Sequence, residues 1–338
     1  METKQHRFRI IDVLRGISAL AVALFHFNEP YPALSDPYHA LLKWGWLGVS
    51  VFFVVSGFCI AGARTKAGVV VFWKRRLMRI YPAYWASLVV VLAVIALRLL
   101  TTGTNDVTRI PHGLSAWLYT IAALTTPSSP VPAMNWAYWS LGYELAFYIL
   151  MGLLFLRKSA LPIIVFSLFA LLFSSVGYPF NHWGLFGLGA ACHLFVERRW
   201  RSAAILAAIC ICHVMIAHHP VETTVGFLTA LLIAFPPPLI SAPLFAPLKR
   251  IGLFSYSLYL THVPIGCFLI PHYLGARFTR GLWSSMLQDA ILLSGSLIFS
   301  YVFYRVIEKP THELARRRST TPDKVSPLDA TNKFAKQR

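Results

Sequence analysis

The chain has 338 residues, of which 57% are hydrophobic and only 13% are charged. Because a soluble domain carries about 25% charged residues, this composition excludes an ordinary soluble globular protein. The net charge of +18 would suit a nucleic-acid-binding protein, but Lys and Arg are grouped between long apolar runs. That grouping is typical of a polytopic α-helical membrane protein, whose partner is the lipid bilayer and not nucleic acid.

Ten apolar runs follow one another along the chain, and each predicts a transmembrane helix. They lie at 10–28, 44–63, 79–100, 134–156, 161–177, 180–196, 203–218, 221–238, 250–270 and 284–307. The four runs between 161 and 238 are short, and the loop 101–133 is expected to contain a short interfacial or re-entrant piece. A membrane domain is therefore expected at 1–312, followed at 313–338 by a basic, disordered cytoplasmic tail.

The distribution of charge agrees with ten spans. Twenty-five Lys and Arg residues fall on the side of the N-terminus, five fall on the opposite side, and Arg15 lies inside the first span. Since positively charged loops stay in the cytoplasm, both termini are expected there. The five cysteines all lie in apolar runs without the spacing of a disulfide or a metal site, so neither is expected.

The first apolar run, "VLRGISALAVALFHF", contains two ionisable residues, Arg15 and His26. The two residues are eleven positions apart, which is about three helical turns, so both side chains share one face and lie about 16 Å apart along the axis. Ionisable groups at this depth are costly and suggest function. Two structural alternatives remain open: Arg15 reaching back to the lipid headgroups, and His26 lying at the membrane interface.

Two further runs carry ionisable groups to a similar depth. In "NWAYWSLGYELAFY", Glu144 and Tyr148 are four residues apart, and in "SYSLYLTHVP", Tyr259 and His262 are three residues apart. Each pair shares a helical face. We therefore expect Glu144, His262 and His26 to line one polar cavity, although Glu144 as a structural partner of an Arg or His, and a structural His262, are also possible readings.

A basic cluster begins the third span, in "FWKRRLMRIYPAYW". Lys74, Arg75, Arg76 and Arg79 lie at the cytoplasmic interface, and the last two share a helical face. Guanidinium groups bind phosphate oxygens through two parallel hydrogen bonds, so this cluster predicts a phosphate site. Plain positive-inside anchoring is the alternative reading.

The preceding run, "GVSVFFVVSGFCI", contains small residues among aromatic ones, including Ser56 and Gly57. Small residues in a membrane helix permit close packing of a neighbouring helix. They also leave room for a narrow ligand arm. The small residues of this run therefore predict either close helix packing or a passage for a ligand.

At these residues the sequence resembles the bacterial acyltransferase 3 family of integral membrane O-acyltransferases. The resemblance rests on "RIIDVLRGISALAVALFHF", "GVSVFFVVSGF", Arg76 with Arg79, "WSLGYELAFY", "SYSLYLTHVP" and "EKP" at 308–310, in this order. It implies a multi-pass protein of the bacterial inner membrane that uses cytoplasmic acyl-CoA, above all acetyl-CoA. The acceptor would be a hydroxyl of a cell-surface or exported glycan or glycoside, and no tightly bound cofactor is implied.

The resemblance also implies roles for individual residues. His26 is similar to the catalytic histidine and Arg15 to its motif partner, and Glu144 and His262 match further catalytic motif positions. Donor contacts are expected from the basic cluster and the small residues, namely Arg76, Arg79, Arg75, Lys74, Ser56 and Gly57. Acceptor contacts are expected from Tyr259, Ser255, Trp139 and Tyr143.

Two other classes of function are alternatives to the acyltransferase. Ionisable groups at mid-depth also mark the pathways of secondary transporters and proton-coupled carriers. The chain shows no internal repeat, which many transporter folds have, and its basic cluster is of the phosphate-binding type. A scaffold without chemistry would leave the Arg, His and Glu residues at mid-depth without a purpose. The acyltransferase is therefore favoured.

Overall fold

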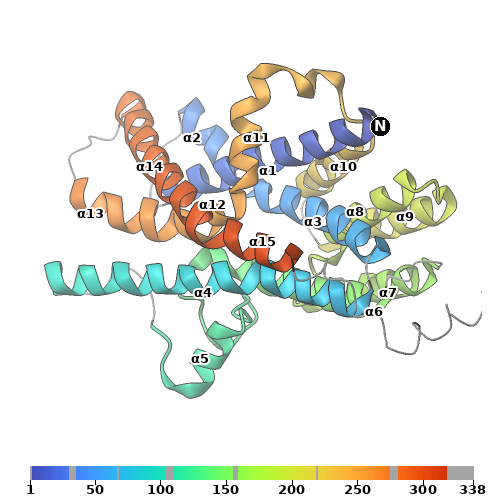
Figure 1. The fold of residues 1–338 in the computed structure, drawn as a ribbon, viewed down its shortest axis with the longest axis horizontal. Coiled ribbons are helices and arrows are strands. Elements are labelled where there is room, and N and C mark those ends of the chain that lie inside the picture. The colour runs from blue at the N-terminus through green and yellow to red at the C-terminus, as the bar shows by residue number, and fades with distance from the viewer. Residues whose placement is uncertain are drawn as a thin grey trace, which may run out of the picture.

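The computed structural model describes residues 2–29, 36–66, 68–103, 110–154, 159–217, 220–274 and 281–317. Within these ranges the regular structure is entirely helical and contains no strand, so the all-α prediction is confirmed. Figure 1 shows a bundle in which the long α4 runs along one side and α5 projects from it.

The helices are, in chain order, α1 (Glu2–Asn28), α2 (Pro37–Leu42), α3 (Leu47–Lys66), α4 (Val69–Thr102), α5 (Gly113–Ile121), η1 (Trp136–Tyr138), α6 (Trp139–Leu154), α7 (Leu161–Leu172), η2 (Ser174–Val176), α8 (Trp183–Val196), α9 (Trp200–Ala217), α10 (Pro220–Ala234), η3 (Pro238–Ser241), η4 (Pro243–Phe245), α11 (Ala246–Leu253), α12 (Ser255–His262), η5 (Val263–Leu269), α13 (Ile270–Leu274), α14 (Leu282–Phe303), η6 (Tyr304–Glu308) and α15 (Lys309–Arg317). The segments η5 and η6 are π-helical and continue α12 and α14. Every predicted apolar run therefore contains a helix.

The predicted number of ten spans is not confirmed. Six helical segments in the described ranges are long and apolar enough to cross a membrane, or seven if the pair Pro243–Leu253 and Ser255–Leu274, bent by 61°, is one span. The apolar helices α7, α8 and α10 have only 12, 14 and 15 residues. At 1.5 Å per residue they reach about 18–23 Å, which is less than the ~30 Å hydrocarbon core. The chain is thus a multi-pass membrane protein with a mixture of full and short helices.

Two further predictions concern the loop 101–133 and the end of the membrane domain. The short helix expected in the loop 101–133 is present as α5, while residues 104–109 of that loop lie outside the described residues. The last helix continues to Arg317, five residues past the predicted domain end at 312. Residues 318–338 of the predicted tail lie outside the described residues.

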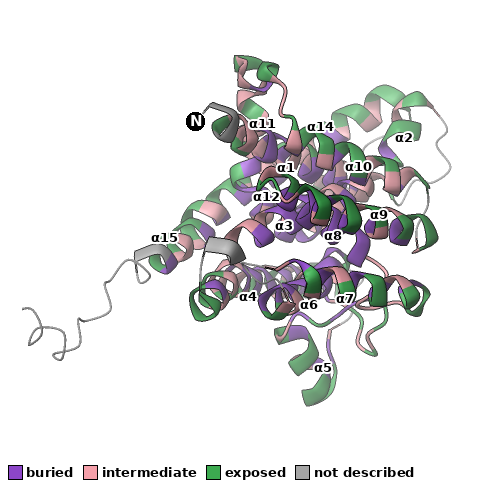
Figure 2. Ribbon diagram, turned by 90° about the vertical axis from the view of Figure 1, so that its right-hand side faces the viewer, coloured by how far each residue is buried: buried purple, intermediate pink, exposed green. Residues whose placement is uncertain are grey.

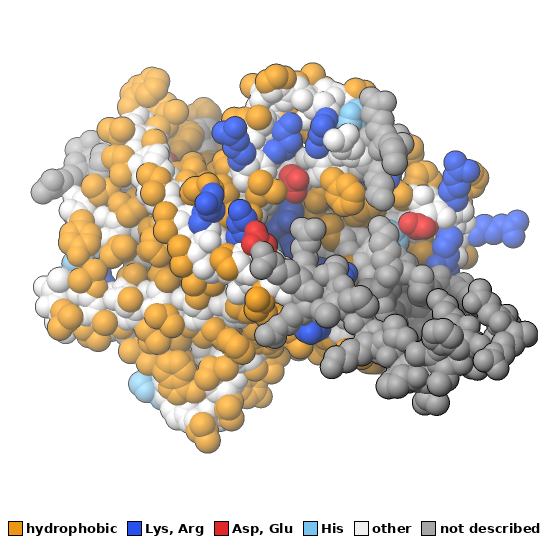
Figure 3. Space-filling view, in the orientation of Figure 1, with side chains coloured by type: hydrophobic (Ala, Val, Ile, Leu, Met, Phe, Trp, Pro, Cys, Tyr) orange, Lys and Arg blue, Asp and Glu red, His pale blue; other side chains and the backbone are white. Residues whose placement is uncertain are grey.

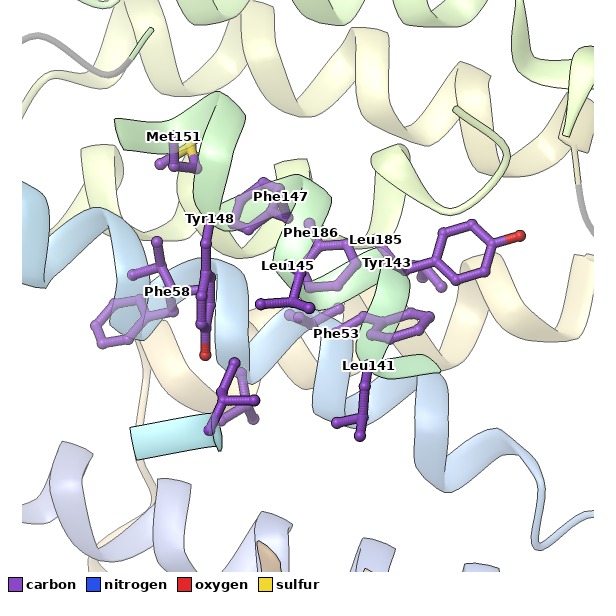
Figure 4. Close-up of a cluster of buried hydrophobic side chains, with 14 of the residues drawn as sticks. Phe53, Phe58, Leu141, Tyr143, Leu145, Phe147, Tyr148, Met151, Leu185 and Phe186 are labelled. Atoms are coloured by element: carbon purple, nitrogen blue, oxygen red, sulfur yellow. The ribbon is translucent and has the colours of Figure 1, made fainter. Parts of the chain in front are cut away.

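The centre of the bundle is the crossing of α3 and α8, where buried residues gather in Figure 2. All residues of α8 from Trp183 to Leu194 are buried. Phe186 stacks on Phe53 of α3 and on Phe147 of α6, with ring centroids 4.4 Å apart in both pairs. Figure 4 shows these three rings inside the same buried cluster. The short α8 is therefore stable because it is apolar all round and enclosed by longer helices.

Glycine permits this crossing. A Cβ atom on Gly57 of α3 would lie 2.0 Å from the carbonyl oxygen of Phe186, and one on Gly189 would lie 2.0 Å from the carbonyl oxygen of Val54. Neither backbone can move away without separating the two helices. Gly57 thus serves helix packing, the first of its two predicted interpretations.

We expect Gly57→Ala to destabilise the protein by roughly 1–3 kcal/mol or more, because the added methyl group overpacks a backbone contact. Thermal unfolding of the purified protein in detergent measures the effect as a lower Tm. Gly68→Ala is the matched control, since a Cβ atom there meets nothing within 4 Å. Equal Tm values for the two variants would contradict the packing role.

The surface reflects the membrane environment. Figure 3 shows hydrophobic side chains over the left and lower parts of this face, while Lys and Arg gather in its centre and upper right. Large apolar residues such as Leu100, Val70 and Trp283 are 79–85% exposed. Exposure of this extent and number fits contact with lipid and not with water.

Candidate functional site: two adjoining cavities

Two cavities adjoin inside the bundle and share the wall residues Val49, Phe53 and Tyr259. The first, here called the basic cavity, measures about 70 Å³ and is lined by Arg15, Arg76, Arg79, Glu144, Tyr148, Ser56, Cys59, Ser140, Ser255, Tyr256 and apolar residues. The second, here called the aromatic cavity, measures about 340 Å³ and is lined by His26, Glu29, Glu222, Trp46, Trp136, Trp139, His182, Ser50, Val22 and Phe25. Most residues singled out from the sequence line one of these two cavities.

Helix α1 connects the cavities. It is continuous from Glu2 to Asn28, so Arg15 and His26 lie on one helix face as predicted. Arg15 lines the basic cavity and His26 lines the aromatic cavity. Their separation of eleven positions corresponds to about 16 Å along the axis. One helix therefore contributes an ionisable side chain to each cavity.

Helix α4 supplies the other two cations of the basic cavity. Arg76 and Arg79 are one turn apart, and both are partly buried. The Arg76 guanidinium lies over the rings of Phe72 and Tyr148, 5.7 and 5.6 Å from their centroids. Its Nε is buried and has no hydrogen-bond partner among the described residues. Such a donor favours an oxyanion ligand.

The two other members of the predicted basic cluster behave differently. Lys74 and Arg75 belong to the same helix turn, but their side chains are exposed and do not line the basic cavity. Adjacent positions on a helix point in directions about 100° apart, so a cluster contiguous in sequence cannot all face one ligand.

Glu144 is held as a hydrogen-bond acceptor in the basic cavity. Ser56 Oγ donates to Glu144 Oε1 over 2.9 Å, and the Tyr148 hydroxyl donates to the same oxygen. Three arginines and one carboxylate line this cavity, so its net charge is positive. Glu144 was predicted to share a cavity with both histidines, but it lines the basic cavity, His26 lines the aromatic cavity, and His262 lines neither. Glu144 faces α3 and α4, whereas the histidines meet between α1 and α12.

His26 and His262 form a pair. The distance from His26 Nδ1 to His262 Nε2 is 2.9 Å, and the rings are stacked with centroids 5.1 Å apart. His262 Nδ1 lies 3.0 Å from the carbonyl oxygen of Leu258, which can only accept. A neutral His262 therefore carries its proton on Nδ1 and accepts at Nε2.

This chain of bonds assigns the tautomer of the first histidine. Because His262 Nε2 accepts, His26 Nδ1 must be the donor, and the lone pair of a neutral His26 is on Nε2. His26 lines the aromatic cavity, and its ring lies edge-on to Trp136 at 6.2 Å. The pair thus leaves one basic nitrogen for a ligand in that cavity.

The predicted acceptor residues divide between the two cavities. Tyr259 is in the shared wall, where its hydroxyl donates to the carbonyl oxygen of Ala137 over 2.6 Å and lies 2.7 Å from Ser140 Oγ. Trp139 lines the aromatic cavity, and Ser255 lines the basic one. Tyr143 is buried behind the aromatic cavity, with its ring 4.7 Å from that of His182.

Sequence reasoning missed five lining residues of the aromatic cavity: Glu29, Glu222, Trp46, Trp136 and His182. They come from the end of α1, the start of α10 and the segments before α3, α6 and α8. Trp136 lies in a quoted motif and Glu29 follows His26 by one turn, which were the available signals. Burial raises the pKa of the Glu29 carboxyl above its usual value, so this group loses its charge at a higher pH than a solvated glutamate.

Comparison with known proteins agrees with the motifs. The family model for the acyltransferase domain matches residues 8–305. The acyltransferase MdmB of Streptomyces mycarofaciens is 32% identical over 155 residues, which are 44% of this chain and 40% of that protein. The O-acetyltransferase OatA of Staphylococcus aureus is 35% identical over 89 residues, 24% of this chain and 13% of that protein. The matched segments thus cover less than half of either relative.

No solved structure matches the chain significantly. The family model, in contrast, spans nearly all of the membrane domain, including both cavities and the helix that joins them. The chain therefore belongs to the acyltransferase 3 family.

Proposed function

We propose that the protein is a membrane O-acyltransferase that moves an acyl group, above all acetyl, from cytoplasmic acyl-CoA to a hydroxyl of a cell-surface or exported glycan or glycoside. The observation that carries this proposal is the junction of two cavities of opposite character beside His26. With the N-terminus in the cytoplasm, the basic cavity opens toward the donor and the aromatic cavity toward the acceptor. The enzyme belongs to the bacterial cytoplasmic membrane.

The basic cavity suits the donor. Coenzyme A carries three phosphate groups, and Arg15, Arg76 and Arg79 offer guanidinium donors beside a single carboxylate. At about 70 Å³ the basic cavity is smaller than the aromatic cavity at about 340 Å³, and so suits the narrow pantetheine arm better than a sugar. The span of ~16 Å between Arg15 and His26 is comparable to that arm when extended. The phosphates would remain near the cytoplasmic mouth while the thioester reaches the histidine.

The histidine pair suits acyl transfer. As general base, His26 Nε2 takes the proton of the acceptor hydroxyl while its oxygen attacks the thioester carbonyl. The tetrahedral intermediate then expels the thiolate, which takes the proton from His26 and leaves as coenzyme A thiol. His262 Nε2 accepts a hydrogen bond from His26 Nδ1–H and so holds the His26 ring in the active tautomer and orientation.

A nucleophilic route uses the same nitrogen. His26 Nε2 attacks the thioester carbonyl and forms an acyl-imidazolium as the thiolate of coenzyme A leaves; the acceptor hydroxyl then attacks the acyl group, Nε2 is released, and the hydroxyl proton passes to the thiolate. Incubation with labelled acetyl-CoA and no acceptor separates the two routes, because only the second leaves label on the protein.

We expect His262→Ala to lower kcat by ~10–100-fold, the range found when a group that orients a metal-bound histidine through its other ring nitrogen is removed. KM for the donor should change little, because His262 does not line the basic cavity. His262→Gln can still offer an acceptor to His26 Nδ1 and should recover part of kcat. A loss of donor binding in both variants would instead indicate a general structural role.

Mass spectrometry of envelope glycans and exported glycosides tests the proposed function in cells. Strains with the protein should carry glycans heavier by one acyl group than strains without it. The His26→Ala variant should behave as the strain without it. Identical spectra in all three strains would contradict the proposal.

A further inference from the structure

We propose that the aromatic cavity binds an acceptor that carries a protonated amine beside its reacting hydroxyl, as an amino sugar does. This inference rests on the proposed function, in which the aromatic cavity holds the acceptor. It goes further by naming a charge that the acceptor must carry.

The first argument is electrostatic. Glu29 and Glu222 both line the aromatic cavity, and no Lys or Arg among the described residues does. The chain as a whole has 31 Lys and Arg but only 13 Asp and Glu, so an acidic cavity runs against its composition. The adjoining basic cavity has the opposite balance. A cation is the ligand charge that such a cavity favours, because nearby opposite charge stabilises the ionised form.

The second argument is the origin of the two carboxylates. Glu29 follows His26 by three residues, about one turn, at the end of α1. Glu222 is 6% exposed and comes from the first turn of α10. Two separate helices thus bring carboxylates to the cavity that contains the reactive histidine. Glu29 is exposed, so a ligand in the cavity can reach its carboxylate.

The third argument is the aromatic lining. Trp46, Trp136 and Trp139 form walls of the same cavity. Aromatic faces attract ammonium groups, and tryptophan does so most strongly. A neutral sugar would also stack on these rings, so it is their combination with carboxylates that selects an amine. The same carboxylates disfavour acidic acceptors, such as uronic acids or phosphorylated sugars, by like-charge repulsion.

The test uses a matched pair of glycosides, methyl 2-amino-2-deoxyglucoside and methyl glucoside, which differ by one ammonium group. Binding to the purified full-length protein is followed by quenching of tryptophan fluorescence at neutral pH, without acyl-CoA. The amine should bind roughly ten-fold or more tightly than the neutral glycoside, as expected for a charge-assisted hydrogen bond. Glu222→Gln and Glu29→Gln should each reduce that ratio, while the exposed Glu197→Gln at the end of α8 should leave it unchanged.

Two readouts separate this inference from the proposed function. If both glycosides bind equally or neither binds, the inference is wrong, whatever the enzyme transfers. If the amine binds preferentially but no acetyl group is ever transferred to it from acetyl-CoA, the acyltransferase proposal fails and the binding site stands. The ratio measured on the unaltered protein decides the matter even where a glutamate variant does not fold.

Discussion

Replacing His26 with alanine is expected to lower acyl transfer by at least ~100-fold while acyl-CoA binding stays nearly unchanged. His26 Nε2 is the free basic nitrogen of the histidine pair, and it borders the aromatic cavity and not the basic one. Either proposed route loses its proton acceptor or its nucleophile. Single-turnover transfer from labelled acetyl-CoA and equilibrium binding of the same donor measure the two effects separately.

Two control variants test whether the loss of transfer is specific to an imidazole at position 26. The exchange of His26 and Phe27 moves the imidazole by about 100° around α1, so it should not restore transfer. His272→Ala removes a histidine that bonds to Arg98 over 2.8 Å and lines neither cavity, and it should leave transfer intact. Transfer by His26→Ala at near the normal rate would reduce this histidine to an interfacial residue.

The second large effect concerns the donor. Arg76→Ala and Arg79→Ala should each weaken acyl-CoA binding ten-fold or more, because a hydrogen bond to a charged group contributes ~1.5–3 kcal/mol. Lysine at either position should restore only part of the affinity, since an ammonium group does not reproduce the planar fork. The Kd for acetyl-CoA in detergent is the measurement, together with the Tm to verify folding.

Lys74→Ala is the matched control for these arginines. It removes one positive charge from the same helix turn, but from the exposed side. Because exposed charges are screened by salt, its effect on Kd should stay below ~3-fold. Equal losses for Lys74, Arg76 and Arg79 would mean that the cluster acts only as a general positive field that sets topology.

The sequence predicts the positions of the helices better than it predicts how many of them cross the membrane. Hydrophobicity places every apolar run in a helix, because each must bury its backbone hydrogen bonds in lipid or protein. It cannot show that α8 is enclosed by its neighbours through Gly57 and Gly189, and such a helix need not cross the whole membrane. The number of spans depends on this tertiary packing.

For the candidate site, too, the sequence predicts what depends on one helix and does not predict what depends on the packing of several helices. Helical periodicity correctly places Arg15 and His26 on one face and Arg76 with Arg79 on another, but Lys74 and Arg75, which were also predicted as donor contacts, are exposed and do not line the basic cavity. Depth alone wrongly assigns Glu144 and His262 to the cavity of His26, because similar depth in the membrane does not fix the position of a helix around the bundle. Glu29 and Glu222 are far apart in sequence, and only the packing of α10 beside α1 and α3 brings them together.

Acyl transfer by the purified protein tests the central claim most directly. The protein is incubated with acetyl-CoA labelled in the acetyl group and with an amino-sugar glycoside, and both the ester on the glycoside and the free thiol of coenzyme A are quantified. The account predicts one acetyl ester on a hydroxyl for each thiol released, and neither product with His26→Ala. Movement of unmodified glycoside across a proteoliposome membrane without ester formation would contradict it and identify a transporter.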